Sequence, residues 1–123
     1  MNIHLEIWLR GDNHATRHVI DPVGREPRAW TDGDVAAVLV GMLRALQRAK
    51  DPAADQDRPV SLRGFSWIVN PFEDGGVVIA LELSLGVVVA GPFDIAEHDL
   101  SVMIGRVMVH EAMPARPGPG MVH

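Results

Sequence analysis

Three side chains of this sequence, His4, Glu6 and Glu82, are of types that bind metal ions or transfer protons. His4 and Glu6 are two residues apart in a segment that alternates apolar and polar residues, so both lie on one face of a predicted strand. If Glu82 lay on a neighbouring strand, the three could hold zinc, manganese or iron. No motif fixes that third ligand, and a solvated His4 is the simpler interpretation. We therefore predict no metal site and no cofactor.

Glu82 is also a candidate acid or base in its own right. It lies between two leucines, and Trp67 is expected to face it, so its carboxyl would sit in a partly dry site suited to proton transfer. The alternative is an ion pair with Arg10 or Arg63. The chain contains no nucleophile elbow, P-loop, dinucleotide-binding fingerprint or HExxH motif, so whether it is an enzyme stays open.

The composition excludes several classes of protein. The 123 residues include no cysteine, which rules out disulfide scaffolds, thiolate zinc sites and cysteine nucleophiles. A formal net charge of -5 opposes nucleic-acid binding. The first residues alternate where a signal peptide would be continuously apolar, and the apolar stretch 77–93 is too short and interrupted to cross a bilayer. We expect a cytoplasmic protein with neither nucleic acid nor membrane as a partner.

Hydrophobic periodicity predicts the elements that position these side chains. Residues 2–10 alternate as a half-buried strand, and two β-rich stretches, 61–70 and 77–90, flank the turn signal PFEDGG. A short strand over 17–21 is left open. Two helices are expected, ending near residues 50 and 112, and each follows a pair that resembles a capping box: Thr31 with Asp34, and Asp94 with Glu97.

The order β-(β)-α-β-β-α predicts an α+β fold. The expected architecture is a two-layer sandwich, an antiparallel sheet of about four strands with two helices on one face. Residues 1–113 should form a single domain, and 114–123, rich in proline and glycine, a disordered C-terminal tail.

The hairpin turn predicts which side chains the helices leave uncovered. A two-residue turn at Asp74 and Gly75 pairs Trp67 with Glu82 and places the alternate residues from Ile79 to Val89 beneath the helices. A three-residue turn would reverse one strand against the other. The predicted open face mixes aromatic, small and charged residues, and as a ligand or interface face it comprises His4, Glu6, Trp8, Arg10, Arg63, Phe65, Trp67, Glu82 and Ser84.

Exposed aromatic residues beside small ones indicate an interaction surface. We expect a small non-enzymatic association or accessory protein, a homo-oligomer (dimer) joined through this face. The alternative is a small-molecule-binding protein or enzyme, with Trp8 and Trp67 as walls of a pocket for an apolar ligand and Glu82 as acid or base. A third interpretation has the curled sheet itself, or residues 11–30, cover the face as a second small core.

Overall fold

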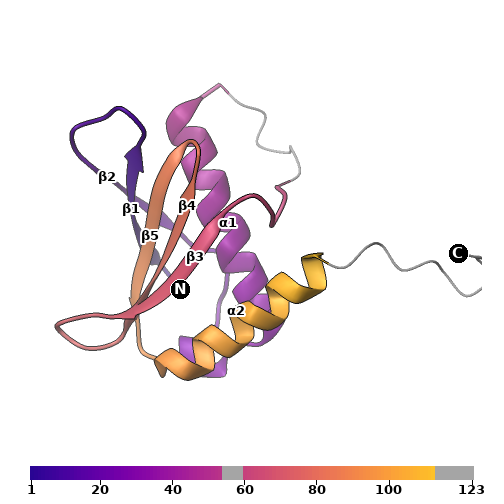
Figure 1. Cartoon of the computed structure of the whole chain (residues 1–123). Helices are drawn as coiled ribbons and strands as arrows, with labels where there is room; N and C mark the ends of the chain where they lie inside the picture. Colours follow the sequence, from indigo (N-terminus) through magenta and orange to yellow (C-terminus); the bar gives the residue numbers. More distant parts are fainter. Residues whose placement is uncertain (54–59, 113–123) are drawn as a thin grey trace, which may run out of the picture.

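The computed structural model describes residues 1–53 and 60–112, and the predicted tail, 114–123, lies outside them. Figure 1 shows a single sheet with two long helices beside it. The elements are β1 (Ile3–Leu9), β2 (Thr16–Ile20), the short 3-10 helix η1 (Pro27–Ala29), α1 (Asp32–Lys50), β3 (Ser66–Pro71), β4 (Val77–Leu83), β5 (Gly86–Phe93) and α2 (Glu97–Ala112).

The sheet is antiparallel throughout, in the order β2-β1-β5-β4-β3, and both helices lie on the same face of it (Figure 1). The predicted α+β fold is confirmed. The sheet has five strands rather than about four, because residues 16–20 form β2 and the apolar stretch 77–93 folds back on itself as β4 and β5. No helix within the described ranges is long and apolar enough to cross a membrane.

The core lies between the sheet and the helices. Alternate residues of β1 are almost completely buried, as expected for a half-buried strand. The apolar stripe of α1 is buried with them, and α2 adds Leu100 and Ile104. Trp30 meets Phe93 edge-to-face at 5.0 Å between ring centroids, which closes the core where β5 ends.

The capping box of α1 is confirmed, whereas that of α2 is not. The Thr31 hydroxyl accepts from the Asp34 amide, and the Asp34 carboxylate accepts from the Thr31 amide. Helix α2 begins only at Glu97, and Asp94 instead forms an ion pair with Arg28 at 3.0 Å.

The predicted register of the β3–β4 hairpin is wrong by one residue. Pro71 pairs with Val77, and the Phe72 amide donates to the Gly76 carbonyl, so an odd number of residues separates the strands. Both Gly75 and Gly76 have positive φ, the conformation that a three-residue turn with a glycine bulge requires. Glu82 therefore pairs with Ser66, and Trp67 pairs with Leu81 on the helix side.

This register moves three predicted face residues to the opposite side of the sheet. Phe65 and Trp67 are partly buried against the core. The Arg63 guanidinium reaches the end of α2, where it donates to the Glu111 carbonyl at 2.7 and 3.2 Å. That carbonyl belongs to the last turn of the helix, so Arg63 satisfies an acceptor that the helix leaves free.

The prediction for 77–90 as one strand is also wrong. Leu83 pairs with Gly86, which leaves a turn of two residues, Ser84 and Leu85. Because the chain reverses there, the buried set changes from the odd-numbered residues of β4 to Val88 and Ala90 in β5. The valines at 87 and 89, expected beneath the helices, lie on the other face of the sheet.

We predict that Trp67 stabilises the fold whereas its neighbour Ile68 does not. Replacing Trp67 by alanine removes a large side chain packed on the core and should lower the free energy of unfolding by about 2 kcal/mol. Ile68, 51 % exposed on the opposite face, is the matched control, and Ile68→Ala should cost below about 0.5 kcal/mol. Urea denaturation followed by circular dichroism measures both, and equal losses would contradict the register.

Candidate functional site

The face of the sheet that the helices leave uncovered is the candidate site. Its central row follows directly from the strand pairings: Arg17 pairs with Glu6, Glu6 with Val89, Val89 with Ala80, and Ala80 with Ile68. This row crosses all five strands, with β5 in the middle. A band of apolar side chains at its centre is thus flanked by charged residues towards β2 and by Ile68 at β3.

Two further rows complete this surface, which we call the open face. Trp8, Val87, Glu82 and Ser66 form the row on one side of the centre. Val19 and His4 pair on the other side, in line with Val78 and Asn70. Several of the large apolar side chains are strongly exposed for their type: Trp8 (40 %), Val19 (55 %), Ile68 (51 %) and the adjoining Phe72 (42 %).

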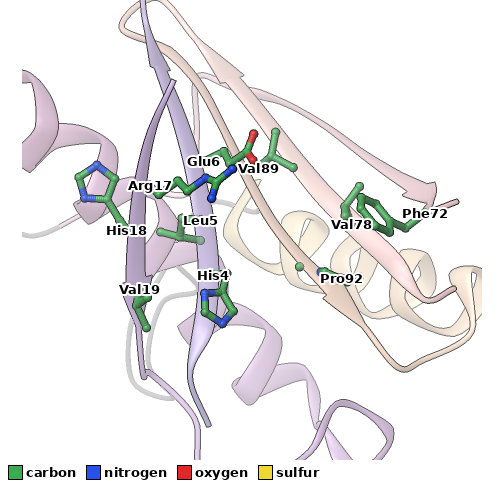
Figure 2. A pocket seen from close by; sticks show the side chains of 11 residues that line it. His4, Leu5, Glu6, Arg17, His18, Val19, Phe72, Val78, Val89 and Pro92 are labelled. Carbon is green, nitrogen blue, oxygen red and sulfur yellow. The ribbon is translucent and has the colours of Figure 1, made fainter. Parts of the chain in front are cut away.

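A hollow of about 480 Å³ lies on the open face beside β5. Figure 2 shows His4 and Val19 on one side of it, Val78 and Phe72 on the other, and Pro92 between. Gly91 also lines this hollow. A Cβ there would lie 2.9 Å from the Val77 carbonyl oxygen, and φ is +129°, so the backbone accepts only glycine.

The lining of this hollow is mostly apolar, with a polar end formed by Glu6 and Arg17 (Figure 2). Such a lining suits an apolar group more than an ion. His4 and Glu6 are on one strand as predicted, but β5 separates β1 from β4, so Glu82 does not join them. Across residues 1–53 and 60–112, no group of three or more His, Asp or Glu side chains is placed to hold a metal ion.

Glu82 lies instead in a second, polar hollow at the end of the open face. Arg10 and Ser84 share this hollow, and the Arg10 guanidinium donates to the Ser84 carbonyl at 2.9 Å. Glu82 is exposed and pairs with Ser66 rather than with Trp67. The dry aromatic setting on which the acid–base hypothesis depended is therefore not present.

Of the nine predicted face residues, six lie on the open face or at its edge: His4, Glu6, Trp8, Arg10, Glu82 and Ser84. Phe65, although it packs against the core, also lines the polar hollow at this edge. Five residues of the open face were not predicted, because they depend on β2, β5 and the shifted register of β3: Arg17, Val19, Ile68, Val87 and Val89.

Gly86 was the sequence signal that could have placed Val87 and Val89, because a strand break could have been predicted there. Residues 11–30 do not cover the open face, since Val23 and Trp30 belong to the core on the other side.

The clearest electrostatic coupling among the described residues lies away from the open face, between the two helices. Asp32 at the start of α1 binds the Arg106 guanidinium through two contacts of 2.8 and 2.9 Å. This hydrogen bonding holds the pKa of the Asp32 carboxyl below its ordinary value and raises the pKa of Arg106. Both groups face solvent, so the pair joins α1 to α2 with a small contribution to stability.

Comparison with protein-family models, with curated proteins and with solved structures found no significant match to this chain. The function is therefore inferred from the strand pairings, exposure and charges of the open face.

We predict a pH-dependent contribution of Asp32 to stability. Because its pKa is lowered in the folded state, the stabilisation is present above the ordinary aspartate pKa and is lost as the pH falls through the folded-state value. The free energy of unfolding of Asp32→Asn should be slightly below that of the original chain at pH 6, and the two should converge below about pH 4. Denaturation curves recorded at several pH values across this range measure the difference in the free energy of unfolding between the two chains.

The control is the same substitution in an Arg106→Gln background. Without the guanidinium, Asp32→Asn should no longer produce the acid-side convergence. An unchanged pH profile in that background would show that another group is responsible.

Proposed function

We propose that this protein acts by association and that its open face binds a second copy of the same chain. The observation that carries the proposal is the set of exposed large apolar side chains on the open face, Trp8, Val19 and Ile68, which no described segment covers. Contact between these apolar side chains and water is unfavourable. Packing a second sheet on the open face would remove the side chains from water. An accessory role towards another protein would use the same surface.

The charges of the open face favour a copy of this chain as the partner. The whole chain carries a formal net charge of -5, so two copies repel each other on average. On the open face the acidic Glu6 and Glu82 are balanced by Arg10 and Arg17, which gives a formal charge of zero. Two acidic chains can meet there with little net repulsion and with groups of both signs available for pairing.

The size of the face indicates a weak dimer. Five strands about 4.8 Å apart and seven residues about 3.4 Å apart give a face of roughly 24 Å by 24 Å, or about 580 Å². A typical stable interface buries about 800 Å² on each partner. Area alone does not determine affinity, but interfaces smaller than this are typical of weak or transient complexes, and we expect dissociation in the micromolar range.

A second candidate function is the binding of a small apolar molecule in the hollow beside β5. The volume of about 480 Å³ is in the range of small-molecule sites, and the lining is predominantly apolar. Because the hollow is part of the open face, such a ligand and a second copy would contact the same residues.

We predict that Val89→Lys weakens self-association. Val89 is at the centre of the open face, so its replacement places a charged side chain in the dimer interface, where it must lose its hydration, and should raise the dissociation constant at least about tenfold. Sedimentation equilibrium over micromolar loading concentrations measures this constant.

Val109→Lys is the matched control, because Val109 is 63 % exposed on α2, on the helix side of the sheet, and should leave association unchanged. Circular dichroism establishes that each variant is folded. If Val89→Lys does not fold, Ile68→Lys at the edge of the same face replaces it. A chain that stays monomeric at several hundred micromolar, or equal effects of both lysines, would contradict the proposal.

A further inference from the structure

The arrangement of two copies follows from the positions of charges on the open face, given the proposed dimer. When a sheet face packs on its own copy, the two-fold axis lies between the sheets, parallel to them. Aligned sheets pack about 10 Å apart with their strands within about 30° of each other. When the axis passes through the centre of the open face, it can run along β5, the middle strand, or across β5 at the central row, and these two choices bring different residues together.

An axis across the strands brings the residues of the central row against their own copies. Glu6 would lie over the partner's Glu6, and Arg17 over the partner's Arg17, because that row is perpendicular to the strands. Each contact places like charges together in an interface that excludes water, which is destabilising.

An axis along β5 exchanges β1 with β4 and β2 with β3. Glu6 then lies over the partner's Ala80, whose small side chain leaves room for the carboxylate. Arg17 lies over the partner's Ile68 at the rim, where its apolar stem can cover the isoleucine while the guanidinium stays in water.

The same axis also separates Glu82 from its own copy. Glu82 lies over the partner's Trp8. Arg10 stays beside Glu82 of its own chain, since its guanidinium donates to the Ser84 carbonyl and both side chains line the polar hollow. This arrangement therefore avoids the two like-charge contacts of the central row.

We infer that the two-fold axis of the dimer runs along β5, so that Val87 and Val89 each pack against their own copies. The inference rests on the proposed dimer and adds its symmetry. Val87 separates these two arrangements, because it lies one row from the centre and meets the partner's Val87 when the axis follows the strand but not when the axis crosses at the central row. Ile68 meets the partner's Ile68 only when the axis runs across the strands.

The absence of cysteine makes a direct test possible, since each introduced thiol is unique in the chain. Val87→Cys and Ile68→Cys are labelled with a short bis-maleimide and, separately, with nitroxide spin labels. In the inferred dimer the two Val87 positions are about 10 Å apart and the two Ile68 positions about 20 Å apart, from strand spacing and sheet separation. We expect Val87→Cys to cross-link at least about fivefold more than Ile68→Cys, with the shorter spin–spin distance.

The possible failures are distinguishable. If sedimentation shows that neither cysteine variant nor the original chain associates, the proposed dimer itself is overturned. If the chain dimerises but Ile68→Cys cross-links in preference to Val87→Cys, or neither does, the dimer stands and the axis along β5 is wrong. Val109→Cys on α2 controls for random collision and should give only background cross-linking.

Discussion

The structure depends on an unequal covering of one sheet. Two helices are sufficient to bury one face of five antiparallel strands, and the buried residues of β1, α1 and α2 form a single layer between them. Nothing in the described chain plays the same part on the other side. The apolar content of 47 % is therefore divided between a core and a surface, and the surface share includes Trp8, Val19 and Ile68 on the uncovered face.

The elements were predictable because each has a strong local signal. The stripe from Val35 to Leu46 and the Thr31–Asp34 box define α1, and strict alternation defines β1. The fold class followed from those elements. The short strand β2 has a weak pattern of its own and is stabilised by pairing with β1, which explains why the sequence left it open.

The composition of the open face was harder to predict, because it depends on whether each hairpin loop has an odd or even number of residues. The PFEDGG segment carries turn signals for both, and the paired glycines with positive φ select the odd count. The break at Ser84 and Leu85 has Gly86 as its one local signal within a run of valines and leucines. These two details decide the positions of Trp67, Val87 and Val89, so the sequence could predict an uncovered face without predicting all of its members.

Loop length between Pro71 and Val77 has an evolutionary consequence. Deletion or insertion of one residue there would invert β3 relative to β4 and exchange Trp67 and Phe65 with Ile68 and Ser66 between the two faces. The remaining strands would keep their pairings, so the exchange would be confined to one edge of the sheet. A single codon gained or lost in this loop could thus alter the binding chemistry of a descendant protein in one step, where point substitutions would need several.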